Sequence, residues 1–103
     1  MPEFIYAAKV DEVQENQILA LMIDEIPVAL TRIEGKIIAF GDVCTHDDGP
    51  LAEGEIDDHC VVCPRHGARF DLTSGKATFP AAYPIPIYKT RIENDVVQVC
   101  LER

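Results

Sequence analysis

Cys44-Thr45-His46 and Cys63-Pro64-Arg65-His66 are the two segments that decide how the rest of this 103-residue sequence is interpreted. Each segment brings one thiol and one imidazole close together, and the sixteen residues 47–62 separate the two segments. Gly49-Pro50 follows the first segment and Gly67 follows the second, and these turn residues allow both to bend around a bound group. The two matched pairs predict a metal site whose ligands are Cys44, His46, Cys63 and His66.

Mixed sulfur and nitrogen ligation has two common outcomes in proteins. One is a closed tetrahedral zinc site, and the other is a [2Fe-2S] cluster in which two histidines replace two cysteines on one iron. Zinc modules usually group cysteines and histidines in separate pairs, whereas each segment here mixes the two types. The order of the ligands favours the cluster, and a structural zinc-binding module is the alternative.

Length, composition and charge limit the number of domains, the kinds of partner and the location that we expect for this chain. No stretch of linker composition divides the chain, so we expect a single domain spanning 1–103. Eighteen acidic and nine basic residues give a net charge of -9, which argues against nucleic acid and anionic membranes as partners. The chain shows no signal-peptide pattern and no membrane span, so we expect a cytoplasmic protein. In that reducing compartment its four cysteines favour metal ligation over disulfides.

The acidic excess is concentrated in residues 42–58, which contain no lysine or arginine. Two interpretations stay open for this stretch, a solvated loop face or a face that docks a basic partner protein. The carboxylates concerned belong to Asp42, Asp47, Asp48, Glu53, Glu55, Asp57 and Asp58.

Short runs of β-branched residues between turn residues predict an all-β protein without a long helix. Glu34-Gly35-Lys36 predicts a tight hairpin turn, because glycine readily adopts the positive φ that such turns need. Pro80, Pro84 and Pro86 predict a stiff, ordered loop. The expected strands cover residues 4–10, 18–23, 26–33, 36–40, 59–62, 68–71, 87–92 and 96–101, with a turn or one short helical turn at 11–16.

Taken together, these motifs resemble the Rieske ferredoxins that serve bacterial ring-hydroxylating dioxygenases. Besides the two ligand segments, the resemblance rests on Gly49-Pro50-Leu51, on Gly67, and on Phe70-Asp71 followed by Ser74-Gly75, and it extends from about Phe4 to Leu101. It implies the Rieske fold, an antiparallel β-sandwich with a small cluster-binding subdomain at approximately 42–80. In that family two ligand loops and a covering proline loop form the subdomain.

The resemblance also implies how the chain works. Cys44 and Cys63 would bind one iron of a single [2Fe-2S] cluster, and His46 and His66 would bind the other iron and form the electron exit. The chain would be a monomeric electron carrier rather than an enzyme, taking electrons from a flavin-dependent reductase to a terminal ring-hydroxylating oxygenase. A small accessory subunit of an assimilatory nitrite reductase is an alternative with the same fold.

Four positions indicate the soluble, low-potential branch of this family. Gly49 and Arg65 stand where quinol-oxidising relatives carry a disulfide, so that bridge cannot form. Ala68 and Phe70 stand where those relatives carry a Ser and a Tyr that donate hydrogen bonds to cluster sulfurs. Each lost donor removes ~1.5 to 3 kcal/mol of stabilisation from the reduced state, or up to roughly 100 mV. We therefore predict a potential near the lower end of the Rieske range, about -150 mV.

Several other residues are assigned no chemistry. His59 is expected to be a surface or half-buried residue at the head of a strand. Cys60 is expected to be a buried core thiol, and Cys100 a packing thiol. Arg65 and Arg69 either form local ion pairs or balance cluster charge, and the sequence leaves both interpretations open. Tyr83 is assigned to the proline loop without a catalytic role.

Overall fold

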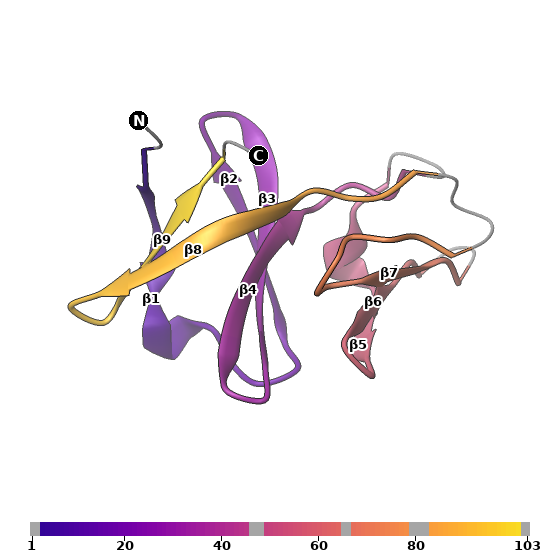
Figure 1. The fold of residues 1–103 in the computed structure, drawn as a ribbon, viewed down its shortest axis with the longest axis horizontal. Helices are drawn as coiled ribbons and strands as arrows, with labels where there is room; N and C mark the ends of the chain where they lie inside the picture. Colours follow the sequence, from indigo (N-terminus) through magenta and orange to yellow (C-terminus); the bar gives the residue numbers. More distant parts are fainter. Residues whose placement is uncertain (1–2, 46–48, 65–66, 79–82, 102–103) are drawn as a thin grey trace.

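The computed structural model describes residues 3–45, 49–64, 67–78 and 83–101, and within them the expected all-β architecture is confirmed (Figure 1). Apart from two short 3-10 helices, every regular element in this part of the chain is a strand. In chain order the elements are β1 (Ile5–Lys9), η1 (Val10–Glu12), β2 (Ile18–Ile23), β3 (Ile26–Ile33), β4 (Lys36–Gly41), η2 (Leu51–Glu53), β5 (Glu55–Asp57), β6 (Cys60–Val62), β7 (Arg69–Asp71), β8 (Ile87–Glu93) and β9 (Val96–Cys100).

The strands form two antiparallel sheets. The larger sheet has six strands in the order β1-β9-β8-β4-β3-β2, and the smaller has three in the order β5-β6-β7. Strand β1 also approaches β2, so the larger sheet curls towards a closed barrel. The smaller sheet and the loops around it form a separate lobe at one end of the molecule (Figure 1). Nowhere in the described residues is there a helix of the length and apolar character needed to cross a membrane.

Two-residue turns fix the register of four hairpins. Both central residues of each turn have positive φ, which matches the twist of the flanking strands. Glu34-Gly35 is the turn predicted from the sequence, and it joins Ile33 directly to Lys36. The other three turns are Asp24-Glu25, Asp58-His59 and Asn94-Asp95.

Strand β3 supplies both hydrophobic cores, because it is buried on both faces. Val28 and Leu30 point into the interior of the curled sheet, whereas Ala29 and Ile33 point to the opposite side, where the smaller lobe packs. Phe40 of β4 joins the second group. That second core includes Leu51, Val61, Phe70, Leu72 and Ile85 together with Cys44 and Cys63. The two predicted cysteine ligands therefore lie in the core between the large sheet and the small lobe.

The predicted strands agree with the observed ones to within one or two residues, but two elements of the small lobe were missed. These are η2 and β5, each three residues long and each with few apolar residues to reveal it. His59 is exposed, as expected of a surface residue, but it lies in the β5–β6 turn with φ 67° rather than at the head of a strand. Pro84 and Pro86 lie outside regular strands as expected, and Pro80 lies outside the described residues.

Candidate metal centre

Cys44 lies three residues beyond the end of β4, at the start of the first ligand loop. Its side chain is fully buried, and its backbone N–H donates to the carbonyl oxygen of Gly49 at 2.7 Å. This hydrogen bond brings the two ends of the loop together around residues 46–48, which lie outside the described residues. Thr45 is fixed from another direction, because its hydroxyl donates to the carbonyl oxygen of Tyr83 at 2.6 Å. The first ligand loop is thus tied to the proline loop, to which Tyr83 belongs.

Cys63 directly follows β6 and begins the second ligand loop. Its side chain is 1% exposed, its N–H donates to the Ala68 carbonyl at 2.7 Å, and its own carbonyl accepts from the N–H of Gly67 at 3.1 Å. Gly67 has a φ of 73°, a conformation that glycine adopts without steric cost. These hydrogen bonds hold the two ends of the loop, Cys63 and Gly67-Ala68, close together between β6 and β7.

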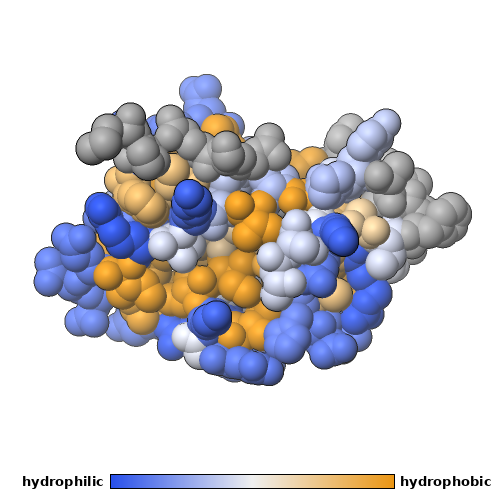
Figure 2. Space-filling view, in the orientation of Figure 1, coloured by the Kyte–Doolittle hydropathy of each residue, from blue (hydrophilic) through white to orange (hydrophobic). Residues whose placement is uncertain are grey.

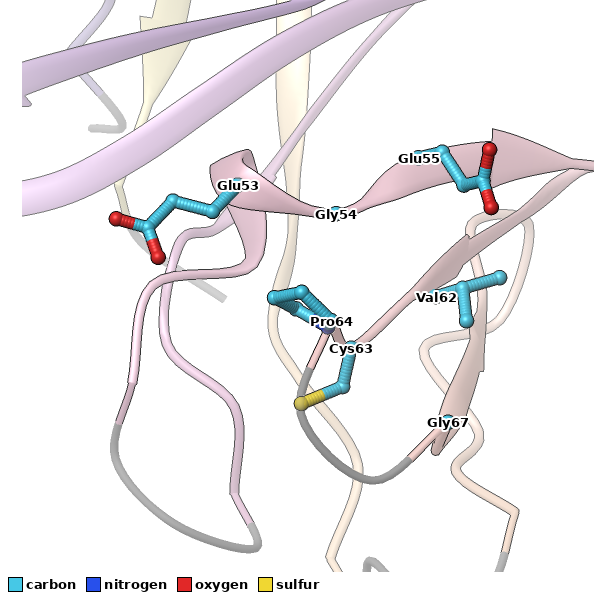
Figure 3. A pocket seen from close by; sticks show the side chains of 7 residues that line it. All are labelled: Glu53, Gly54, Glu55, Val62, Cys63, Pro64 and Gly67. Carbon is cyan, nitrogen blue, oxygen red and sulfur yellow. The ribbon is translucent and has the colours of Figure 1, made fainter.

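A pocket of about 480 Å³ adjoins the second ligand loop, and Figure 3 shows its lining residues. The carboxylates of Glu53 and Glu55 point away from each other and from the sulfur of Cys63. Gly54 lies between them, and a Cβ at this position would approach the Val62 carbonyl oxygen to 1.9 Å and Pro64 Cδ to 3.2 Å. Glycine is required here because the segment after η2 packs directly on the backbone at the end of β6, where the second ligand loop begins.

The chemistry of the two cysteines fits a bound iron-sulfur cluster. Both thiols are buried in an apolar core, and none of the four cysteines, all of which the structure describes, forms a disulfide. A thiolate buried in such surroundings is stable only with a strong electrostatic partner, which a metal provides. His46 and His66 lie outside the described residues, and no group of three or more potential ligands occurs among the residues that are described.

Asp42 does not belong to an exposed acidic face, because its side chain is buried. Only 7% of the residue is exposed, so neither interpretation of residues 42–58 applies to it. Its carboxylate accepts from the Ala52 N–H at 2.7 Å, and burial raises the pKa of Asp42 despite the backbone hydrogen bonds from Ala52 and Leu51. Asp42 therefore connects the end of β4 to η2 across the first ligand loop. Glu53, Glu55, Asp57 and Asp58 are exposed, and Asp47 and Asp48 lie outside the described residues.

Arg69 forms a local ion pair, which settles one of the alternatives left open by the sequence. Its guanidinium donates to Asp57 Oδ2 at 3.0 Å and to the Asp57 carbonyl at 3.1 Å, and the hydrogen bond to Asp57 raises the pKa of Arg69. The pair links β7 to β5 across the small sheet. One carboxylate of the predicted acidic face is consequently already compensated within the chain. Arg65 lies outside the described residues.

The remaining single residues also have observed surroundings. Cys100 is a buried packing thiol as expected, whereas the expectation of a buried core thiol at Cys60 is wrong, because Cys60 is only half-buried. His59 Nε2 lies 3.1 Å from Glu34 Oε1, so the β5–β6 turn contacts the β3–β4 turn of the large sheet. The sequence did not predict the steric requirement for glycine at position 54 or the hydrogen bond between Thr45 and Tyr83. A hydrogen bond between residues so far apart leaves no local signal in the sequence.

Known proteins provide an independent comparison. The Rieske [2Fe-2S] domain family matches residues 3–89. The ferredoxin component of naphthalene 1,2-dioxygenase/salicylate 5-hydroxylase systems from Ralstonia sp is 32% identical over 100 residues, 96% of each chain. The 3-phenylpropionate/cinnamic acid dioxygenase ferredoxin subunit of Escherichia coli is 40% identical over 92 residues, 86% of this chain and 85% of that one. A solved Sphingomonas yanoikuyae ferredoxin has a TM-score of 0.90 at 26% identity and covers 97% of this chain and 100% of that one.

The chain belongs to the Rieske [2Fe-2S] domain family. It is an electron carrier of the ferredoxin type, as in ring-hydroxylating dioxygenase systems, and it binds one [2Fe-2S] cluster. The cluster supplies one-electron oxidation and reduction when it is bound. The protein supplies two buried thiols, Cys44 and Cys63, in two loops closed by backbone hydrogen bonds, and a folded sheet that supports both loops.

Proposed function

We propose that this chain carries single electrons from a flavin-dependent reductase to a terminal ring-hydroxylating oxygenase. The observation that carries the proposal is the pair of buried thiols, Cys44 and Cys63, at the start of two hydrogen-bonded loops in a chain of ferredoxin length. The relatives of this length are ferredoxin components of dioxygenase systems, so we assign the substrate chemistry to the partner that receives the electron.

Within this proposal, Cys44 and Cys63 bind one iron, and His46 and His66 bind the other. In this proposal the two imidazoles, as neutral ligands of the second iron, form the exit for the electron. Residues 1–103 act as a single Rieske domain, and the carrier works as a monomer. Ala68 and Phe70, both fully buried and both unable to donate from their side chains, support a potential near the lower end of the Rieske range, about -150 mV.

Electron transfer with purified partners tests the proposal. The holoprotein is mixed with the organism's flavin-dependent reductases and NAD(P)H, and then with its ring-hydroxylating oxygenases, while cluster absorption is followed. We expect rapid reduction by one reductase and reoxidation by one oxygenase. If no reductase reduces the protein, or if the reduced protein donates to no oxygenase, the carrier proposal is wrong.

Spectroscopy and potential separate this proposal from its alternatives. A Rieske cluster gives a reduced-state EPR signal with an average g below 2, whereas a structural zinc module gives a colourless protein with one zinc. Transfer to a nitrite reductase large subunit, with no transfer to any oxygenase, would favour the accessory-subunit alternative. A measured potential above about +100 mV would contradict the low-potential assignment.

A further inference from the structure

A group of exposed apolar side chains lies beside the first ligand loop. Five large apolar side chains are well exposed in the described part of the chain, and three of them, Met22, Ile26 and Tyr83, come from two segments that meet at this end of the large sheet. Ile26 and Tyr83 both line a groove of about 320 Å³ that is walled by apolar residues. The other two exposed side chains, Tyr6 and Ile92, lie on β1 and β8 and take no part in this groove.

The groove has rigid walls. Pro27 forms part of one wall, and Met22 stands directly opposite Pro27 in the β2–β3 ladder, so the two side chains share one face of the sheet. On the opposite wall, the Gly41 N–H donates to the Pro86 carbonyl at 2.9 Å, and Thr45 holds Tyr83 by its carbonyl. A groove of this kind is formed before any partner arrives, so little ordering entropy opposes binding.

The groove is continuous with the proposed electron exit. Thr45 lines the groove and stands between Cys44 and His46 in the first ligand loop. A protein that covers the groove is therefore brought within reach of that loop. The rim carries negative charge, since Asp24 and Glu25 form the exposed turn next to Ile26, and none of the groove's lining residues is basic.

We infer that this groove docks an apolar side chain, flanked by lysine or arginine, on the surface of the redox partners. The inference rests on the proposed function, because a carrier with one electron exit must present the same end to its reductase and to its oxygenase. The apolar insertion supplies affinity, and the basic flank complements Asp24, Glu25 and the net charge of -9. Both partners use the groove, one after the other, so the two complexes exclude each other.

Matched pairs of variants test this inference in the holoprotein. The groove variant Ile26→Ser/Tyr83→Ser is compared with Ile92→Ser/Tyr6→Ser, which makes the same chemical changes at exposed positions outside the groove. We expect the groove variant to raise the KM for ferredoxin about tenfold with both the reductase and the oxygenase, with kcat and the reduction potential unchanged. The control should match wild type.

The outcomes separate the inference from the proposed function. If wild type transfers electrons but the groove variant has the same KM as the control with either partner, the shared groove is wrong and the carrier function stands. If wild type itself passes no electron, the proposed function is wrong. Should Ile26→Ser lower the cluster content, Tyr83→Ser alone, at a 69% exposed position that lines the groove, repeats the comparison with Tyr6→Ser as its control.

The charged rim gives a second, independent readout. Neutralising it with Asp24→Asn/Glu25→Gln should raise the KM a few fold at low ionic strength, and the difference should shrink as the Debye length falls from ~30 Å to ~8 Å. Asparagine suits the positive φ of this turn, so the hairpin is retained. A KM unchanged at low salt would overturn the basic flank assigned to the partner.

Discussion

The large sheet and the small lobe are stabilised in different ways. Strands β2, β3 and β4 have six to eight residues each and pair along their whole length around a core of their own. Strands β5, β6 and β7 have three residues each, which is too short for an independently stable sheet. Figure 2 shows a related contrast on the surface, with apolar residues gathered over β4 and β8 and hydrophilic residues over most of the small lobe.

This difference indicates which region depends on the bound cluster. The core of the large sheet consists of apolar side chains alone, whereas the small lobe buries Cys44 and Cys63 in the core that joins it to β3 and β4. A metal centre that links the two loops of the lobe contributes its binding free energy to the folding of that lobe. We therefore expect the two regions to respond unequally when the cluster is lost.

The largest expected effect comes from removing the cluster. Cys44→Ser or Cys63→Ser should abolish cluster binding and leave the amides of β5–β7 unprotected in hydrogen exchange, while those of β2–β4 keep most of their protection. Cys100→Ser is the matched control, because Cys100 is also buried but lies on β9, away from both ligand loops. Equal loss of protection in the two sheets would mean that the molecule unfolds as one unit and would contradict this division.

Two glycines with positive φ allow a comparison of the regions by substitution. At Gly75 of the small lobe (φ 84°), a Cβ would lie 2.4 Å from the Ile85 carbonyl oxygen, whereas at Gly35 of the large sheet (φ 80°) nothing lies within 4 Å. Gly35→Ala should cost only the left-handed conformation, ~1 to 2 kcal/mol. Gly75→Ala should cost roughly 2 kcal/mol more, because the backbone must shift. Chemical denaturation of the two holoprotein variants measures the loss in free energy of unfolding for each. Equal losses would show that the close approach to Ile85 relaxes without cost.

The same contrast explains how much the sequence predicts. The strands of the large sheet were found from their apolar runs, and the Glu34-Gly35 turn from its glycine, because these signals are local. In the small lobe, the spacing of Cys63 predicts a ligand, which stays a prediction, whereas β5 and η2 have one or two apolar residues each and give no period. The burial of Asp42 and the need for glycine at position 54 depend on segments that meet only in the folded chain.

A substitution in the core of the small lobe is expected to have a smaller effect, which is a change in the reduction potential of the cluster. Ala68 is fully buried, and its carbonyl accepts from the Cys63 N–H, so its side chain belongs to the same turn as the ligand. Ala68→Ser adds a hydroxyl that can donate to a cluster sulfur and stabilise the reduced state. The potential should rise by tens of mV, up to roughly 100 mV. Protein-film voltammetry measures it, with Ala39→Ser in the large sheet as a control that should leave the potential unchanged.

The smallest expected effect is a pH dependence of stability that arises from hydrogen bonds in the turn after β7. Thr73 donates to Asp71 Oδ1 from its hydroxyl at 2.6 Å and from its N–H at 2.8 Å, and these bonds lower the pKa of Asp71. A carboxyl whose pKa is lower in the folded state adds stability above its unfolded pKa and loses it as the pH falls through the folded one. Asp71→Asn should therefore lower the Tm slightly at pH 7, and the difference from wild type should disappear in acid. Thr73→Val removes the stronger of the two bonds and should reduce the same pH dependence in part. An equal Tm difference for Asp71→Asn at neutral and acidic pH would assign the effect to packing in the lobe rather than to charge.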